Sequence, residues 1–544
     1  MKITVKRAII GLSLLAGLAS CDVNRLPETN ISDDSFWTSE SDIKTANNYL
    51  YTFLPGFTVP NQGNITEDIW SDDAFGLASN TVSDGSRLAP ATASGDYNTP
   101  YTLIRAANNV LEKAPRAAVT PSILDRYLAE ARFFRAWAYF GLVQKYGSVP
   151  LILKTLDESS PELRQPAAPR ETIIDQVYSD LDFAIANLPT IASLGNADYG
   201  RISKTAAQAF KARVALFEGT FAKFHSKGDA TKHLTLALAA SKAVIDSKEH
   251  ALFGNYFDLF QLAGEGRQNK ENIIVKQYGV SNTERVLTHA YYRSSLETGS
   301  VNPTKALADS YLMKDGLPIT KSPLWTLPDS SHKVFRNRDV RMSATFMKRG
   351  DAMMTTKPIF DIANLVFNKT GYMFRKFANV DDWNTQASTI DRPLLRYAEV
   401  LLTFAEATYE LNNAITDAEL DISINLLRER GQIAKLTNAF AKANGLDLRE
   451  EIRRERRVEL AQEGFRYWDI IRWKTAETEL VKPVLGNFYF KGEFAAATVN
   501  LTPDNIILVQ AASFRKFDPA KDYLWPLPIN EIALNPELDQ NPGW

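Results

Sequence analysis

The fold of this chain is decided by residues 122–146, which read SILDRYLAEARFFRAWAYFGLVQKY. Its apolar residues recur every three or four positions, at Leu124, Leu128, Ala131, Phe134, Ala138 and Leu142. This spacing predicts one long helix with an apolar face. Gly147 is expected to end the helix, and Val149-Pro150-Leu151 is expected to continue as extended chain, because proline disfavours helical geometry in the residue before it.

The same periodicity outside this stretch predicts six more helices. They cover residues 171–188, 203–224, 234–247, 394–411, 417–430 and 446–474. Short turns join them in pairs at spacings of roughly 30 to 45 residues, as in tetratricopeptide (TPR) arrays. The W-x2-L-G-x2-Y signature of TPR repeats is absent. The sequence therefore predicts an all-α, mainly helical fold whose hairpins are TPR-like in geometry alone.

Two long stretches carry little helical signal, namely residues 55–100 and about 255–390. Gly, Asn, Asp, Ser, Thr and Pro are frequent in the second stretch, with Tyr and Trp among them. Irregular segments on a helical scaffold commonly carry function. We therefore expect large irregular ligand-binding loops there.

The N-terminus has the pattern of an exported lipoprotein. A basic start with Lys2, Lys6 and Arg7 precedes an apolar run over 8–19, and Leu-Ala-Ser then leads to Cys21, the only cysteine of 544 residues. The run is too short to span a bilayer, which takes roughly 20 residues. The ending resembles the lipobox of bacterial lipoproteins. It predicts a signal peptide over 1–20, a lipidated Cys21 and a tether over 21–30; the alternative is an ordinary signal peptide with a chance cysteine.

The charge of the mature chain argues against a polyanionic partner. Of 62 basic residues, loss of Lys2, Lys6 and Arg7 leaves 59 against 64 acidic ones, so the formal charge changes from −2 to −5. A mildly acidic protein is not expected to have nucleic acid or an anionic membrane surface as its main partner.

Several phrases recur in a fixed order along almost the whole chain. They lie at 129–151 (AEARFFRAWAYF, then YGSVPL), 200–213 (GRISKTAAQAFKAR), 338–341, 371–376, 395–407, 425–430, 455–473, 526–536 and 540–544. Together they resemble the SusD/RagB family of outer-membrane lipoproteins. The resemblance implies one compact SusD-like unit over 31–544, with an N-terminal part over about 31–225 and a C-terminal part over about 255–544.

The resemblance also implies a function. Such a protein is a surface lipoprotein of the outer membrane that binds oligosaccharides without cleaving them and delivers them to a SusC-like TonB-dependent transporter. Some relatives carry peptides instead. No enzyme activity, cofactor or metal is expected.

The search for catalytic or metal motifs supports this expectation. The five histidines (His225, His233, His250, His289 and His332) form no H-E-x-x-H pair, and no P-loop or dinucleotide fingerprint occurs. Glu455, Glu459 and Glu463 stand among arginines, so paired and ionised carboxylates are the favoured interpretation over acid and base catalysts. The alternatives that stay open are a cell-surface hydrolase using Asp72, Asp73, Asp381 or Asp382, and a scaffold that binds only proteins.

Aromatic residues in irregular segments are the candidate sugar platforms, since a sugar stacks its C–H face on a ring. Six of the nine tryptophans are expected to be structural: Trp37, Trp137, Trp468, Trp473, Trp525 and Trp544. The predicted ligand-binding residues are Trp70, Asp72, Asp73, Trp325 and Trp383, and, from their positions in the family pattern, Tyr97, Asn98, Tyr291, Tyr292 and Arg293. Family members often carry Trp where Tyr97 stands. For each aromatic residue, packing beneath a loop is the alternative.

Overall fold

The structure is a computed structural model that describes residues 33, 36–57, 67–93, 95–280, 287–289, 301–381, 387–494 and 498–544. Six residues to which the sequence assigns a role lie outside the described residues: Cys21, Tyr291, Tyr292, Arg293, Asp382 and Trp383. The predicted all-α class is confirmed, because most of the regular structure is helical and the strands are few and short.

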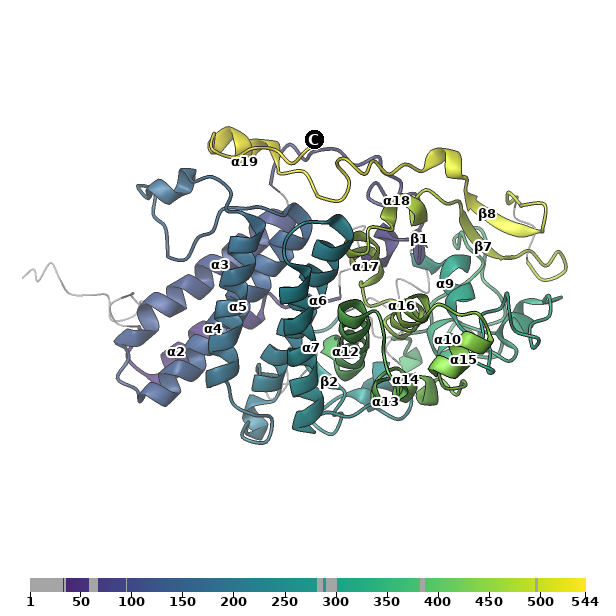
Figure 1. The fold of residues 1–544 in the computed structure, drawn as a ribbon, viewed down its shortest axis with the longest axis horizontal. Coiled ribbons are helices and arrows are strands. Elements are labelled where there is room, and N and C mark those ends of the chain that lie inside the picture. Colours follow the sequence, from purple (N-terminus) through teal and green to yellow (C-terminus); the bar gives the residue numbers. More distant parts are fainter. Residues whose placement is uncertain are drawn as a thin grey trace, which may run out of the picture.

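The N-terminal half is a layer of long helices, drawn from purple to teal in Figure 1. Consecutive helices lie side by side, α3 against α4, α4 against α5 and α6 against α7. The helices are α2 (Glu40–Tyr51), α3 (Gly95–Lys113), α4 (Pro121–Tyr146), α5 (Arg170–Asn187), α6 (Lys204–His225) and α7 (Ala230–Ser247).

Helix α4 is the centre of this layer. Pro121 occupies its first turn, where a missing N–H costs nothing, and Gly147 ends it with φ +74°. Phe133, Phe134 and Tyr139 are fully buried, so the helix is covered on more than the single apolar face that the spacing predicts. Helices packed on both sides bury side chains around most of their circumference.

The C-terminal half consists of shorter helices and hairpins. Its helices are α9 (Lys305–Ser310), α10 (Val340–Thr345), α12 (Tyr397–Asn412), α13 (Asp417–Asp421), α14 (Ile424–Arg430), α15 (Asn438–Ala443), α16 (Leu448–Glu459), α17 (Arg466–Arg472), α18 (Ala476–Glu479) and α19 (Ile529–Leu534). Short 3₁₀ turns occur throughout the chain, of which η2 (Glu67–Trp70), η5 (Asn196–Asp198) and η7 (Leu262–Gly264) bear on the sites below.

Three helix predictions in this half are wrong in detail. Residues 394–396 belong to a strand, the predicted helix 417–430 divides at Ile422 and Ser423, and the predicted helix 446–474 divides between α16 and α17. The last division contains Gln462 and Gly464, both with positive φ (+62° and +81°), a backbone geometry that no α-helix can contain.

The described residues form four two-stranded antiparallel sheets. They pair β1 (Ala74–Gly76) with β3 (Val301–Pro303), β2 (Asn272–Lys276) with β6 (Arg392–Arg396), β4 (Ala352–Met354) with β5 (Lys357–Ile359), and β7 (Val484–Phe488) with β8 (Ile506–Gln510). The first two sheets join residues more than a hundred positions apart. They hold the irregular segments against the helical layer.

The C-terminal segment, yellow in Figure 1, runs back across the N-terminal helices. The Trp525 amide donates to the Lys145 carbonyl at the end of α4 (2.7 Å), and the Ile529 amide donates to the Pro90 carbonyl (2.9 Å). Asn541 Nδ2 donates to the Tyr146 carbonyl (3.0 Å). The two halves are therefore fastened by the end of the chain as well as by their direct contacts.

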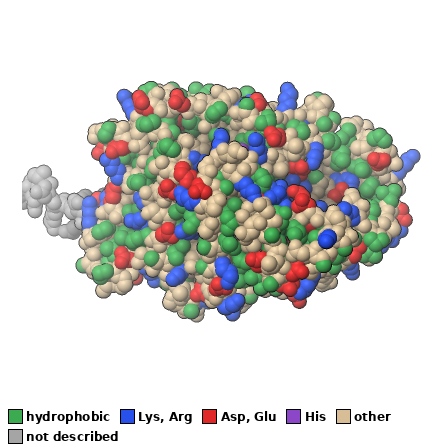
Figure 2. Space-filling model, in the orientation of Figure 1, with side chains coloured by type: hydrophobic (Ala, Val, Ile, Leu, Met, Phe, Trp, Pro, Cys, Tyr) green, Lys and Arg blue, Asp and Glu red, His purple; other side chains and the backbone are tan. Residues whose placement is uncertain are grey.

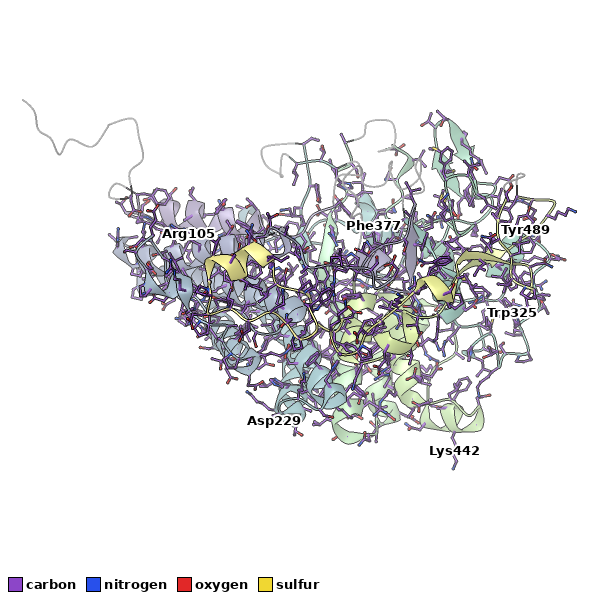
Figure 3. All side chains as sticks on the ribbon, turned by 90° about the horizontal axis from the view of Figure 1, so that it is seen from above. Arg105, Asp229, Trp325, Phe377, Lys442 and Tyr489 are labelled. Carbon is purple, nitrogen blue, oxygen red and sulfur yellow. The ribbon has the colours of Figure 1, made fainter. Side chains whose placement is uncertain are left out.

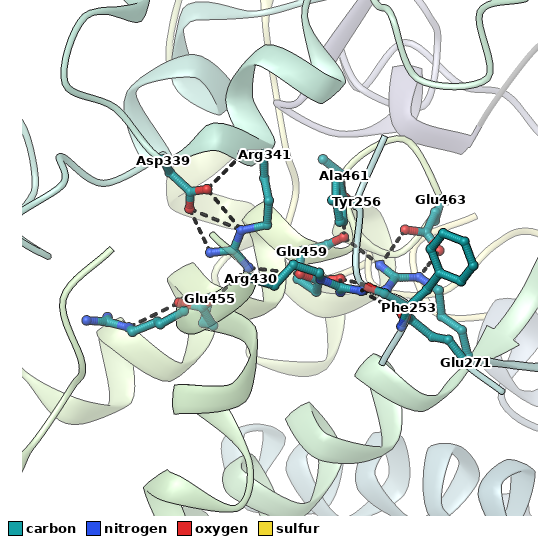
Figure 4. A network of polar contacts seen from close by, with 12 residues as sticks. Phe253, Tyr256, Glu271, Asp339, Arg341, Arg430, Glu455, Glu459, Ala461 and Glu463 are labelled. Atoms are coloured by element: carbon teal, nitrogen blue, oxygen red, sulfur yellow. Dashed lines mark hydrogen bonds and ion pairs between the residues drawn. The ribbon is translucent and has the colours of Figure 1, made fainter. Parts of the chain in front are cut away.

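A buried network of charges forms the centre of the C-terminal half (Figure 4). Glu459, on α16, contacts Arg341 (2.8 Å), Arg396 (2.6 Å) and Arg430 (2.5 Å). The sequence predicts ion pairing at this helix, but with the neighbouring arginines of the same helix. The partners of Glu459 instead come from α10, β6 and α14, which the chain brings together only on folding.

The flanking carboxylates extend the network. Glu455 lies 2.6 Å from Arg341, and Glu463 lies 2.7 Å from Lys376 and 2.8 Å from Arg396. Burial raises the pKa of Glu459, but Arg430, Arg396 and Arg341 outweigh it and lower this pKa to about 2. Burial prevails at Glu455, whose pKa is raised. These residues hold segments of the fold together.

No helix among the described residues is long and apolar enough to cross a membrane. The same part of the chain contains no cluster of three or more His, Cys, Asp and Glu side chains with a metal-binding arrangement.

Candidate functional site

A cavity of about 450 Å³ lies between the helical layer and the C-terminal half. Its walls come from α4 and α6 on one side, and from α12, β6 and the turn between α16 and α17 on the other. Residues that line it include Glu67, Trp70, Asp96, Trp137, Phe140, Gly141, Gln144, Lys145, Phe210, Arg213, Phe217, Arg392, Glu399, Arg456, Glu463, Phe465, Trp468, Asp469 and Arg472. We call it the central cavity.

Aromatic side chains give the central cavity rigid apolar surfaces. Trp137 is half-buried and its ring stacks on that of Phe210, with centroids 4.7 Å apart and 23° between the planes. Phe140 meets Phe210 edge to face from the next turn of α4. Trp468, on α17, is also half-buried, and its Nε1 donates to Glu67 Oε2 (3.1 Å). Indole rings held in this way are suited to stacking against the apolar face of a ligand.

Most charged groups of the wall are paired with oppositely charged side chains. Lys145 lies 2.6 Å from Asp96, Arg213 Nη2 lies 2.5 Å from Glu399, and Arg456 Nε lies 2.9 Å from Asp469. Five basic and five acidic side chains line the cavity. Figure 2 shows the same interspersion of both signs over the outer face. A wall with compensated charges favours a neutral polar ligand over an ion.

Arg456 also leaves a hydrogen-bonding group unmet. Its Nη1 is buried and has no hydrogen-bond partner among the described residues, although its Nε donates to Asp469 (2.9 Å). Nearly all buried donors in folded proteins have a protein or water partner. Arg456 Nη1 is thus one of several buried side-chain atoms of the described chain that have no protein partner.

Gly141 faces the central cavity from the middle of α4. A Cβ placed there would meet no atom within 4 Å. Glycine in a helix interior destabilises the helix by roughly 0.5–1 kcal/mol relative to alanine. Packing does not require glycine at this position, so an approaching ligand is the remaining structural reason for the bare backbone.

The predicted residues around Trp70 and Tyr97 are mostly packed inside. Trp70 borders the central cavity but is only 7% exposed, and its ring centroid lies 5.1 Å from that of Trp525. Tyr97 is buried against Tyr146, with centroids 5.4 Å apart. Asn98 is exposed on the first turn of α3, outside the cavity wall. Ligand contact by these residues stays a prediction.

Asp72 and Asp73 bind arginines. Asp72 lies 2.8 Å from Arg466 and 2.9 Å from Arg457, and Asp73 lies 2.5 Å from Arg457. Burial opposes ionisation of Asp72, but Arg457 and Arg466 prevail and lower its pKa. At Asp73, burial and the neighbouring Asp72 charge prevail, and the pKa is raised. Neither residue lines the central cavity, and their described contacts fasten η2 and the residues after it to α16 and α17.

Trp325 lies far from these residues, at the end of the molecule that also carries Tyr489 (Figure 3). It is half-buried, and its ring lies 5.6 Å from the Arg338 guanidinium carbon. The described part of the predicted set therefore does not gather in one place.

Sequence reasoning missed two of the three tryptophans that line the cavity. Trp137 and Trp468 lie on helices, and helical periodicity assigns such residues to the core. A signal was present in α4, because Trp137, Gly141 and Gln144 follow at i, i+4 and i+7 and so share one face. A small and a polar residue beside a tryptophan on one helix face indicate a surface that is not closely packed.

Comparison with known proteins identifies relatives along the whole chain. Residues 270–544 match the model described as "SusD family", and residues 32–216 match that described as "Starch-binding associating with outer membrane". The chain is 27% identical to SusD-like protein P38 of Formosa agariphila, over 95% of this chain and 93% of that protein. It is 24% identical to a SusD-like protein of Bacteroides ovatus, over 100% of this chain and 99% of that protein.

Comparison with solved structures also finds a SusD-like protein. The fold is similar to that of a SusD-like carbohydrate binding protein from Bacteroides fragilis, with a TM-score of 0.77 and 26% identity. The match covers 93% of this chain and 100% of that one.

Proposed function

The chain belongs to the SusD family, and we propose that it binds neutral oligosaccharides at the outer membrane and holds them in the central cavity without cleaving them. The observation that carries the proposal is the stacked Trp137 and Phe210 pair in a cavity whose charges are compensated. A sugar offers an apolar C–H face and a rim of hydroxyls. The rings match the face, and the paired polar groups and Gln144 match the rim.

Binding without catalysis is supported by the state of the carboxylates. Every carboxylate that lines the cavity has a hydrogen-bond or ion-pair partner in the described structure: Glu67 with Trp468, Asp96 with Lys145, Glu399 with Arg213, Glu463 with Lys376 and Arg396, and Asp469 with Arg456 and Arg472. Glycoside hydrolysis needs one carboxyl kept protonated as an acid and a second one free as base or nucleophile. Four of these five carboxylates are held by cations, and the fifth, Glu67, accepts from the Trp468 indole, so the set does not meet that need.

The wider role follows from the family. We propose that Cys21 carries the lipid, that residues 22–30 tether the body to the outer membrane at the cell surface, and that the bound sugar passes to a SusC-like TonB-dependent transporter. Anchoring keeps the protein and its transporter in one membrane plane, which raises their effective concentration.

The test is calorimetric titration of the mature protein with a panel of neutral oligosaccharides. We expect Trp137→Ala to weaken binding of the active sugar at least tenfold and Trp137→Phe to retain most of it, because the ring supplies the stacking surface. Trp325→Ala is the matched control, a half-buried tryptophan at the far end of the molecule. Unchanged sugar binding in Trp137→Ala together with loss of sugar binding in Trp325→Ala would show that the site is not in the central cavity. Binding of peptides alone would overturn the sugar class, and release of reducing ends would overturn the non-catalytic role.

A further inference from the structure

A second cavity lies beside α2, and it shares no lining residue with the central cavity. Its volume is about 900 Å³. It is bounded by α2, the loop from η5 to α6, the loop after η7, the two residues after β2 and the residues before β6. Its lining residues are Lys44, Asn48, Tyr51, Asn196, Ala197, Tyr199, Gly200, Arg201, Leu262, Glu265, Gly266, Gln268, Gln277, Tyr278, Thr389 and Asp391. We call it the tyrosine groove.

Three tyrosines give the groove its aromatic surface, and two of them are fixed by backbone groups. Tyr51 Oη accepts a hydrogen bond from the Ile202 amide (2.9 Å), and Tyr278 Oη accepts one from the Phe57 amide (2.7 Å). Tyr199 is half-buried on the loop between them; burial, with the Asp391 and Glu265 carboxylates, raises its pKa to about 12. The phenol therefore stays protonated and can donate a hydrogen bond at physiological pH.

Amide side chains lie beside these rings. Gln277 approaches the Gly200 backbone so closely that a Cβ on Gly200 would stand 2.4 Å from Gln277 Oε1, and Gly200 has φ +87°. Only glycine leaves room for the amide in this place. Asn48 is exposed, and its Oδ1 accepts from Arg201 Nη1 (2.6 Å), which fixes the side chain at the rim. Amides offer both donors and acceptors, as sugar hydroxyls require.

Each charged side chain that lines the groove has an ion-pair or hydrogen-bond partner. Lys44 pairs with Asp198 (2.9 Å), and Arg201 pairs with Glu130 (2.5 Å). Asp391 Oδ1 accepts from the Tyr278 amide (2.8 Å), and Glu265 Oε1 accepts from the Asp391 amide (3.0 Å). Lys44 and Arg201 are both paired with carboxylates, so a phosphate would find no free cation among these described residues, whereas a neutral hydroxyl-rich ligand meets donors and acceptors on several walls.

We propose that the tyrosine groove is a second carbohydrate-binding site, which holds a neutral saccharide against Tyr199 and Gln277 independently of the central cavity. The proposal rests on the proposed function for its ligand class, and on the groove alone for its position. A protein with two separate sites would bind one polysaccharide at two points, or two polysaccharide chains at once. Binding one polysaccharide at two points gains avidity without tighter contacts at either site.

The experiment is titration of the mature protein with the oligosaccharide that binds best, with the stoichiometry followed by calorimetry. We expect two equivalents in the wild type and one in Tyr199→Ala, with an affinity loss of at least tenfold at the missing site. Gln277→Ala, which changes no aromatic ring, should weaken the same site. Tyr49→Ala is the control, since Tyr49 lies on α2 next to Asn48 but outside the groove. Melting temperatures establish that each variant is folded.

The variants separate the two proposals. Trp137→Ala should remove one equivalent, Tyr199→Ala the other, and the double variant both. One equivalent in the wild type, lost with Trp137→Ala and untouched by Tyr199→Ala and Gln277→Ala, overturns the tyrosine groove and leaves the central cavity standing. One equivalent lost only with Tyr199→Ala supports the groove and overturns the central cavity as the site.

Discussion

Glu459 shows at the scale of one residue how much this fold relies on buried charge. Its carboxylate is fully buried and contacts three guanidinium groups, those of Arg341, Arg396 and Arg430. Removing one member of such a network leaves the others charged, buried and unpaired, at a cost of roughly 3–5 kcal/mol. We expect Glu459→Gln to lower the free energy of unfolding by about that amount in urea titration at neutral pH.

The control for this variant is Glu450→Gln on the same helix. Glu450 has a side chain that is 62% exposed, so its substitution should change the unfolding free energy by less than about 0.5 kcal/mol. Equal effects of the two variants would contradict the structural role of the network.

His289 predicts a pH dependence of stability. Burial lowers its pKa to about 4, and Nε2 lies 3.0 Å from the Ile390 carbonyl, to which the neutral ring donates. An unfolded histidine titrates near 6.5, so between pH 6.5 and 4 the unfolded chain binds more protons than the folded one. The stabilisation is complete above pH 6.5 and is lost as the pH falls, by up to about 3 kcal/mol from this residue alone.

The measurement compares urea titrations of wild type and His289→Gln at several pH values from 7 to 4. Glutamine can still donate to the Ile390 carbonyl but does not titrate, so its unfolding free energy should fall less steeply on acidification. His225, whose pKa burial also lowers to about 4, is present in both proteins and cancels in the difference. Parallel curves would show that His289 does not titrate in this window.

At the scale of elements, glycine stands at two helical positions for opposite structural reasons. In α6, a Cβ on Gly219 would lie 2.9 Å from the Leu234 amide nitrogen of α7, so this glycine allows the two helices to approach. In α4, a Cβ on Gly141 meets only open space in the central cavity. We expect Gly141→Ala to raise the unfolding free energy by roughly 0.5–1 kcal/mol while weakening sugar binding.

Thermal or urea unfolding and calorimetric titration of the same Gly141→Ala sample test this trade-off, with Gly219→Ala as the destabilised comparison. A more stable variant that binds as tightly as wild type would show that ligand does not approach this face of α4.

Helices α4 to α7 of the N-terminal layer could be predicted from sequence because their apolar spacing is regular, whereas α2 and α3 were not predicted. Helix α5 was expected over 171–188 and spans Arg170–Asn187, and α6 was expected over 203–224 and spans Lys204–His225. The helix predictions fail where pairing with a distant segment determines the secondary structure. Residues 394–396 read as a helix start, but they pair with β2, more than a hundred residues earlier, and no local periodicity encodes that pairing.

The same limit explains the central cavity. Trp137, Arg213 and Trp468 each look like ordinary members of a helix, and only the packing of α4 and α6 against α17 sets them around one space. Sequence reasoning pointed to aromatic residues in loops, because a loop residue has no packing role to explain it. Family resemblance gave the fold and the class of protein, but it did not supply the geometry of a site.

At the scale of the whole molecule, the proposed lipid attachment and the proposed sugar site involve separate residues. Cys21 precedes the described body, and the cavity is built entirely from residues within it. We expect Cys21→Ser to release the protein from the membrane fraction and to leave sugar affinity of the purified protein unchanged. Detergent phase partition measures the first and titration the second; equal partition of variant and wild type would contradict lipidation.

Because the C-terminal segment returns across the helical layer, it affects the order in which the parts of the chain can fold. Trp525 packs on Trp70 and bonds to the end of α4, so the earliest-made helices lack part of their cover until the last residues arrive. A lipoprotein of the kind we propose must cross a membrane before it folds, and a closure that depends on the segment around Trp525 delays compaction during synthesis. We expect the ribosome-bound chain to stay accessible to proteases and to translocase until translation ends.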